Sequence, residues 1–251
     1  VSYIARYRGL SKYLRSVGVA AFEPEYPSCS HTYTPYIFSD EEWKRMISSA
    51  DDLPYSDNNP ESAVLFCILL RILYGCGLRR NEALELETRD IDLNSGVLFV
   101  RHAKNDKQRY VPMDESLTEL LRWYLSVIPH RKYLFVNKIS GKRFSAEWAR
   151  KRMKHLLQDC DIVFERTRKN ERGPCLHCFR HTFVANSFNQ LLQTSLDFDD
   201  AVPFISTYLG HCDLRETDKY LQANYDFFQH DQTLITDYAR KNCIFPEVID
   251  E

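Results

Sequence analysis

The stretch from Leu209 to Tyr220 holds the residues of this 251-residue chain whose types and spacing are best suited to chemistry. A Leu-Gly-His turn ending at His211 is followed nine residues later by Tyr220, in a polar and charge-rich segment. Gly210 closes an apolar helical run, so we expect His211 on a turn at the rim of a core. A tyrosine phenol, with an ordinary pKa of about 10, can act as a nucleophile. Because the chain has 15 tyrosines, Tyr220 by itself is weak evidence for a nucleophile, and the case depends on motifs upstream.

Three upstream motifs supply positive charge and proton carriers. Arg79 follows a glycine turn at an expected helix start, where backbone donors suit an anion, and Glu82 can orient its guanidinium. Lys104 lies at the tip of an expected hairpin. His177 and Arg180 are three residues apart, so on a helix they share one face. Each motif by itself also fits a role without catalysis, such as an exposed ion pair or a solvated lysine.

Together the four motifs match the requirements for cutting a phosphodiester without water. The reaction needs a nucleophile, charge on the non-bridging oxygens, a proton for the leaving 5′ oxygen and groups that manage the nucleophile's proton. Two arginines can clamp the oxygens through forked donors that stay charged. A lysine can donate the proton, and histidines can exchange protons. The pattern predicts that Tyr220 attacks a DNA phosphate.

Composition and local charge set the broad class. Hydrophobic residues make up 44% of the chain and charged residues 27%, as in ordinary folded proteins. No apolar run approaches the length of about 20 residues that a membrane helix needs, and no signal peptide is apparent. We therefore expect no membrane association, a cytoplasmic location and reduced thiols for the eight cysteines. The chain opens without Met in mid-pattern, which favours a piece of a longer protein.

The net charge of −2 hides a strong asymmetry along the chain. Residues 130–181 carry 14 Lys and Arg against 5 Asp and Glu, whereas residues 182–251 carry 4 against 12. A phosphate-binding face needs local positive charge rather than a positive total. Plain solvation remains the alternative for each basic side chain. The candidate phosphate contacts are Arg80, Lys107, Lys142, Arg143, Arg150, Lys151 and Lys154.

The pattern of elements predicts a mainly α-helical fold with one small antiparallel β-sheet, an α+β class. Ser39 and Glu42 form a capping box that opens a helix reaching about residue 49. Strands are expected at 97–101 and 108–112, joined as a hairpin with a basic tip, and at 133–136. The other helices are expected at about 1–19, 60–74, 79–86, 116–128, 146–158, 178–192, 202–209, 216–221 and 227–241. Gly75 and Gly77 are expected to end the helix at 60–74. Prolines and small polar residues mark 20–36 as a linker, so 37–251 forms the main domain.

In order and spacing, these motifs resemble the tyrosine recombinases of the phage integrase family. The resemblance spans about residues 38–238, and implies that Arg79 and Arg180 bind the scissile phosphate and that Lys104 is the general acid. It further implies that His177 assists proton transfer, His211 bonds the phosphate and Tyr220 forms a 3′-phosphotyrosyl link, with Glu82 and His181 in support. Lys107 is a second candidate for the acid, because a small slip of the hairpin would exchange it with Lys104. The segment 189–203 is longer than usual for the family.

The same resemblance implies a fold shared with type IB topoisomerases and a site-specific recombinase or integrase of a phage, transposon or other mobile element. It implies residues 1–19 as the remnant of a DNA-clamping helical domain and no cofactor or metal. Double-stranded DNA is the implied partner, with a homotetramer on synapsed sites, a monomer without DNA, and a location at the nucleoid of a prokaryotic host. The alternatives are a DNA-relaxing topoisomerase, a catalytically silent DNA-binding protein, and a zinc site at Cys175, His177, Cys178 and His181.

Overall fold

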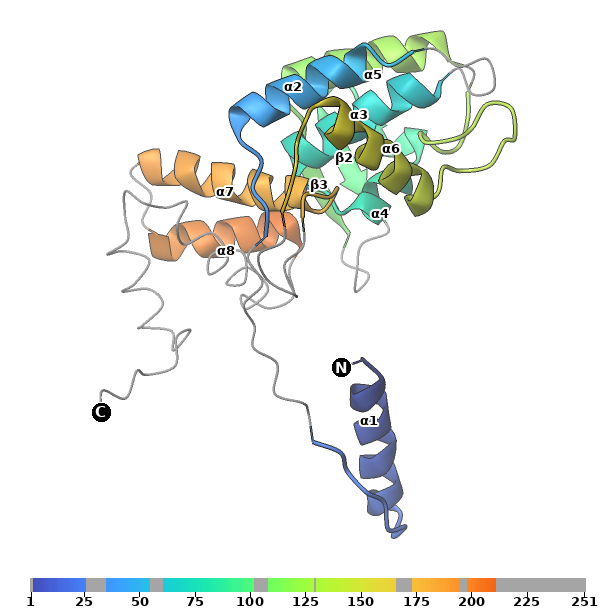
Figure 1. The fold of residues 1–251 in the computed structure, drawn as a ribbon, viewed down its shortest axis with the longest axis vertical. Coiled ribbons are helices and arrows are strands. Elements are labelled where there is room, and N and C mark those ends of the chain that lie inside the picture. Colours follow the sequence, from blue (N-terminus) through green and yellow to red (C-terminus); the bar gives the residue numbers. More distant parts are fainter. Residues whose placement is uncertain are drawn as a thin grey trace. The chain divides into compact units, whose positions relative to one another are not determined.

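The computed structural model describes residues 2–25, 35–54, 61–101, 108–128, 130–165, 173–194 and 198–210 (Figure 1). The chain divides into two compact units, Val1–Tyr33 and Thr34–Glu251. The first unit contains α1 (Ser2–Ser16), and Gly18 follows it with a φ of 82°. Glu23 pairs with Arg8 at 2.6 Å and so holds the following segment against α1. The helix agrees with the prediction for residues 1–19, whereas its origin in a DNA-clamping domain stays a prediction.

The second unit is built around α3 (Ser62–Cys76), whose sequence is almost wholly apolar. Against it pack α2 (Asp40–Asp51), α5 (Glu115–Val127) and α7 (Cys178–Gln193). Burying each Leu or Ile contributes roughly 1.5–3 kcal/mol, so this helix anchors the core. The predicted break at Gly75 is wrong, because α3 continues to Cys76. Gly77 ends it, with a φ of 60° that L side chains rarely adopt.

Local capping signals place two helices as the sequence predicts. Ser39 accepts the backbone N–H of Glu42, and the Glu42 carboxylate accepts the backbone N–H of Ser39, which completes the capping box of α2. Ser145 accepts the backbone N–H of Trp148 and opens α6 (Ala146–Asp159). Both helices therefore begin where a side-chain oxygen replaces a missing intrahelical acceptor.

The sheet is antiparallel in the order β1 (Ile91–Asp92), β2 (Val97–Val100), β3 (Arg109–Pro112). The two predicted hairpin strands are confirmed, with Leu98 opposite Val111. The two-residue β1 is too short to give a sequence signal. The strand predicted at 133–136 is wrong: Tyr133 and Val136 make only isolated bridges, to different partners. The hairpin tip at 102–107 and the helices predicted at 216–221 and 227–241 lie outside the described residues.

At one end of the unit α7 and α8 (Phe198–Leu209) lie side by side (Figure 1). Their contact forms a second apolar cluster that includes Val184, Phe188, Val202 and Ile205. Helix α8 begins four residues earlier than predicted. The short helix α4 (Arg80–Leu84) follows Gly77 and contacts α3 and α6. The C-terminal ends of α3 and α8 thus meet the N-terminal end of α7 next to the start of α4.

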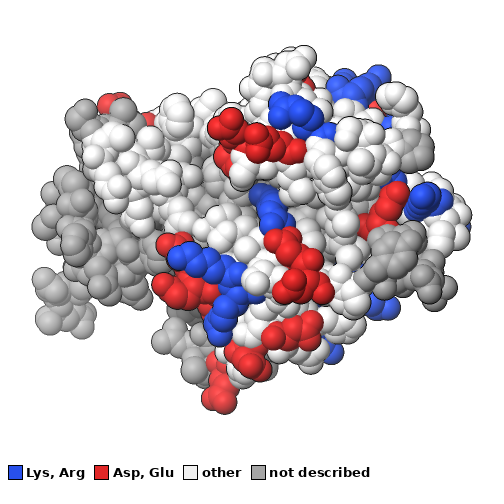
Figure 2. Space-filling model, turned by 90° about the horizontal axis from the view of Figure 1, so that it is seen from above, with Lys and Arg blue, Asp and Glu red and all other residues white. Residues whose placement is uncertain are grey.

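Surface charge and helix length add two further findings. On the face drawn in Figure 2, the described Lys and Arg side chains lie among Asp and Glu side chains, so that face has no uniform positive charge. Among the described residues, no helix is both long enough and apolar enough to cross a membrane.

Candidate active site

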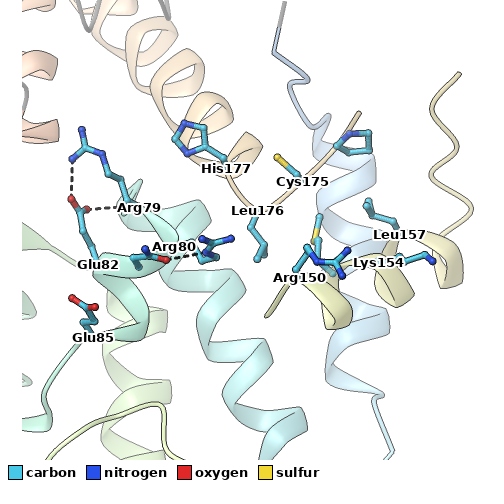
Figure 3. Close-up of a pocket in the computed structure, with 13 residues that line it drawn as sticks. Arg79, Arg80, Glu82, Glu85, Arg150, Lys154, Leu157, Cys175, Leu176 and His177 are labelled. Atoms are coloured by element: carbon cyan, nitrogen blue, oxygen red, sulfur yellow. Dashed lines mark hydrogen bonds and ion pairs between the residues drawn. The ribbon is translucent and has the colours of Figure 1, made fainter. Parts of the chain in front are cut away.

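Arg79 is fixed at the start of α4 by its own helix. It is the N-cap of α4, and its backbone N–H donates to Glu82 Oε2 at 3.0 Å. Its side chain donates from Nη1 to Glu82 Oε1 at 2.9 Å (Figure 3). The side chain of Glu82 is 3% exposed and that of Arg79 20% exposed, so a buried carboxylate holds a guanidinium that reaches solvent.

Glu82 has a second cationic partner, Arg109 of β3. Arg109 Nη2 donates to Glu82 Oε2 at 2.8 Å, and only 9% of the Arg109 side chain is exposed. Burial acts to raise the pKa of Glu82, but the hydrogen bond and charge of Arg109, with those of Arg79, outweigh burial and lower it. Glu82 therefore stays ionised between two arginines that are 30 residues apart in the sequence.

No role for Arg109 is predicted in the motifs described above, although its position in a strand carries a signal for one. Side chains alternate between the two faces of a strand, so Arg109 lies on the same face as Val111. Val111 is fully buried. An arginine that faces the core needs an acidic partner, and Glu82 is that partner.

Replacing Arg109 with methionine is expected to lower the free energy of unfolding by about 3 kcal/mol, because it removes one partner of a buried ion pair. Urea unfolding followed by circular dichroism measures this. The control is Arg150→Met, which breaks a solvent-exposed pair with Glu147 and is expected to change the free energy of unfolding far less. Equal losses in the two variants would contradict a structural role for the Arg109–Glu82 pair.

Arg180 of α7 joins the two turns that carry the other motifs. Its side chain is fully buried, with Nη1 donating to the carbonyl of Gly77 at 2.8 Å and Nη2 to the carbonyl of Leu209 at 3.1 Å. Gly77 lies two residues before Arg79, and Leu209 lies two residues before His211. Arg180 therefore fixes the backbone next to both motifs.

Two histidines lie at the start of α7, one exposed and one buried. His177 is the N-cap of α7, and its ring is 4.9 Å from that of His181. Burial of the ring, followed by the charges of Arg180, Arg79 and Arg80, lowers the pKa of His177 to about 4. Because the residue as a whole is exposed, solvent screens part of this effect. His177 is neutral at pH 7 and can accept a proton.

His181 gives the fold a measurable pH dependence. The residue is 7% exposed, and burial, followed by the charges of His177 and Arg180, lowers its pKa to about 3. Between the unfolded pKa of about 6.5 and this value, the unfolded chain binds a proton that the folded chain does not, so stability falls as pH falls, by up to about 1.4 kcal/mol per pH unit. Above pH 6.5 His181 contributes no slope.

In urea unfolding between pH 7 and pH 4, we expect His181→Gln to lose stability less steeply than the unchanged protein. His155→Gln, which replaces an exposed histidine of α6, is the control and is expected to keep the original slope. Parallel curves for all three proteins would contradict a buried, neutral His181.

A pocket of about 940 Å³ opens between the starts of α4 and α7 and one side of α6 (Figure 3). It brings together six of the residues singled out from the sequence: Arg79, Arg80, Glu82, Arg150, Lys154 and His177. Arg180 and His181 do not line it and are buried. Lys142, Arg143 and Lys151 lie elsewhere, with Arg143 over the ring of Tyr133 at 4.7 Å. Lys104, Lys107, His211 and Tyr220 lie outside the described residues.

Metal ligation finds no support at this site. Within the described ranges, no three His, Cys, Asp or Glu side chains are grouped so that they could hold a metal ion. Cys175 and Cys178 contact each other, with their sulfurs 3.5 Å apart. The described residues of this turn therefore do not form the zinc site considered from the sequence.

Comparison with known proteins decides the family. A family model described as phage integrase family matches residues 38–226, which is most of the chain. The chain belongs to the phage integrase family. The family inferred from the sequence is thereby confirmed.

Relatives of this integrase-family chain carry recombinase names. The putative integrase/recombinase y4rB of Sinorhizobium fredii is 29% identical over 233 residues, covering 89% of this chain and 72% of that protein. Tyrosine recombinase XerC of Chlorobaculum tepidum is 33% identical over 167 residues, covering 63% of this chain and 45% of XerC. The chain thus spans less than half the length of that XerC.

Solved structures confirm the predicted fold class of this family member. The Tn1549 transposon integrase in complex with transposon right end DNA superposes with a TM-score of 0.65 and 15% identity, covering 95% of this chain and 77% of that one. The mainly helical fold of this chain, with its small antiparallel sheet, is therefore similar to the fold of the Tn1549 integrase.

Proposed function

We propose that this chain is the catalytic part of a site-specific DNA recombinase or integrase, which cuts and rejoins strands through a 3′-phosphotyrosyl intermediate. The observation that carries the proposal is the set of charges around His177. Arg79, Arg80 and Arg180 all lie close enough to lower the pKa of His177, and a buried carboxylate orients Arg79. Such a concentration of fixed guanidinium groups beside a neutral imidazole suits a phosphodiester.

The proposed reaction assigns each group one task. Arg79, which lines the pocket, binds the non-bridging oxygens of the scissile phosphate, with His211 bonding the same group. Arg180 is buried and does not line the pocket, and its proposed task is to add positive charge behind the same phosphate. Tyr220 attacks the phosphorus, the bond to the 5′ oxygen breaks, and Lys104 protonates that oxygen. His177, neutral at pH 7, accepts the proton that the phenol of Tyr220 loses. The phosphotyrosyl link keeps the energy of the phosphodiester, so rejoining requires no nucleotide cofactor.

Double-stranded DNA is the proposed partner, and a homotetramer on two synapsed sites the proposed assembly. The names of the relatives support the first statement: the Tn1549 integrase was solved with transposon end DNA, and the XerH recombinase with its difH substrate. Within the pocket, Arg80, Arg150 and Lys154 lie beside Arg79 and are proposed to contact phosphates. A mobile element as the source, and the prokaryotic nucleoid as the place of action, complete the proposal.

The test is a covalent-complex assay on nicked duplexes taken from the regions that flank the gene. A nick close to the cleaved phosphate releases a short fragment, so that the protein stays attached to the remaining strand. We expect a DNA-linked band on a denaturing gel, formed without ATP and unchanged by a chelator. Absence of this band with every flanking duplex would overturn the proposal. Relaxation of supercoils with no joining between sites would instead favour a topoisomerase.

A further inference from the structure

The turn that leads into α7 holds two cysteine sulfurs in contact. Cys175 Sγ and Cys178 Sγ are 3.5 Å apart, and the backbone N–H of Cys175 donates to Cys178 Sγ at 3.3 Å. The backbone N–H of Cys178 donates to the carbonyl of Cys175 at 2.9 Å, which closes the turn. Since a disulfide bond is about 2.05 Å long, the sulfurs need to approach by only about 1.5 Å to form one.

The two thiols differ in solvent exposure, as expected for the attacking and the resolving cysteine of a thiol–disulfide exchange. Cys175 is exposed and lines the pocket, next to His177 (Figure 3), whereas Cys178 is fully buried. The pocket also contains Arg79, Arg80, Arg150 and Lys154, and nearby cations favour the thiolate of an accessible cysteine. The hydrogen bond with Cys175, followed by burial, raises the pKa of the Cys178 thiol. Exposure and nearby charge therefore suit Cys175 to be the attacking thiol and Cys178 the resolving one.

We propose that Cys175 and Cys178 form a redox modification site, which reacts with small-molecule disulfides of the glutathione disulfide type and closes to an intramolecular disulfide. The Cys175 thiolate attacks one sulfur of the reagent and expels the first thiolate, giving a mixed disulfide on Cys175. Cys178 then loses its proton and attacks the Cys175 sulfur, expelling the second thiolate. The protein loses two electrons and two protons, and the reagent leaves as two thiols.

Closing this bond encloses Leu176 and His177 in a four-residue ring. His177 is the N-cap of α7, and Arg180 lies only two residues beyond Cys178. If the chain has the proposed function, this geometry predicts that the reduced protein cleaves DNA and that the disulfide form cleaves it more slowly. This expectation rests on the proposed function. A displacement near 1 Å of catalytic groups can cost about 10²-fold in rate, so we expect a loss of about that size.

The first experiment tests the chemistry without DNA. The whole chain is equilibrated with glutathione and glutathione disulfide at several ratios, alkylated, digested and analysed by mass spectrometry. We expect one peptide containing Cys175 and Cys178 to lack two hydrogens and resist alkylation, and Cys178→Ala to keep glutathione on Cys175. In Cys160→Ser, which removes a remote buried cysteine, the disulfide should still form. A mixed disulfide that persists on Cys175 of the unchanged protein, or no reaction at all, would overturn the proposal.

The second experiment tests the consequence on nicked DNA. Single-turnover cleavage is measured for the reduced protein, the oxidised protein and the oxidised protein treated with a thiol reductant. We expect the loss on oxidation to be reversed by the reductant, and the rate of Cys175→Ser to be unchanged by glutathione disulfide. Equal rates for the reduced and oxidised protein would overturn the link to cleavage. If the reduced protein fails to cleave, the proposed function is contradicted, and the mass measurement still decides the dithiol site.

Discussion

Replacing Tyr220 with phenylalanine is expected to abolish the covalent protein–DNA complex, lowering its rate of formation by more than about 10⁴-fold, because the phenol oxygen is the proposed nucleophile. Binding of an uncut duplex is expected to change by less than about twofold, since phosphate contacts, which supply most of the affinity, come from other side chains. The complex is measured on nicked DNA by denaturing gel, and binding by gel shift at one stated salt concentration.

Tyr225→Phe is the matched control, five residues further along the same segment. It should leave covalent-complex formation within the same order of magnitude as in the unchanged protein. If Tyr225→Phe lost the complex and Tyr220→Phe retained it, Tyr225 would be the nucleophile. The proposed spacing between His211 and the nucleophile would then be wrong. Loss in neither variant would contradict tyrosine catalysis by this segment.

Replacing Arg180 with lysine is expected to reduce both stability and cleavage. The guanidinium bridges the carbonyls of Gly77 and Leu209 inside the protein. A lysine ammonium is a single point and cannot reproduce this fork, so at least one buried carbonyl loses its partner at a cost of about 1–3 kcal/mol. The backbone at Gly77 and Leu209 then loses its common support. Because the positive charge of Arg180 is also proposed to act on the scissile phosphate, we expect cleavage to fall by about 10³-fold or more when that charge is displaced.

Two measurements separate the structural from the chemical part of this effect. Urea unfolding gives the loss of stability, and single-turnover cleavage is compared at a temperature at which circular dichroism shows the variant fully folded. The control is Arg152→Lys, an arginine of α6 that donates to Ser62 Oγ at 2.9 Å and does not line the pocket. Cleavage by Arg152→Lys is expected to stay near that of the unchanged protein. A folded Arg180→Lys variant with undiminished cleavage would contradict the role given to Arg180.

Local features of the sequence determined most elements of the fold. The capping box at Ser39 and Glu42 predicted the start of α2, because a cap depends on residues three positions apart. The strand-type composition of residues 97–101 and 108–112, on either side of a short basic tip, predicted β2 and β3 from local sequence in the same way. The strand predicted at 133–136 failed because a strand requires a neighbour along its length. Tyr133 and Val136 instead bridge to Glu87 and Arg143 separately, which only the path of the chain decides.

For the site, residue types and spacing predicted which motifs carry the chemistry, and the tertiary structure showed how Arg79, Glu82 and Arg180 are supported. Arg79, Glu82 and His177 were identified from residue type and short spacing, and the structure brings them to one pocket. No local pattern reveals that Arg109 shares Glu82 with Arg79, or that Arg180 ties Gly77 to Leu209. Those contacts join positions 27 to 103 residues apart by the packing of β3, α7 and α8. A buried charge finds its partner only when the whole chain has folded, so this part of the site belongs to the tertiary structure.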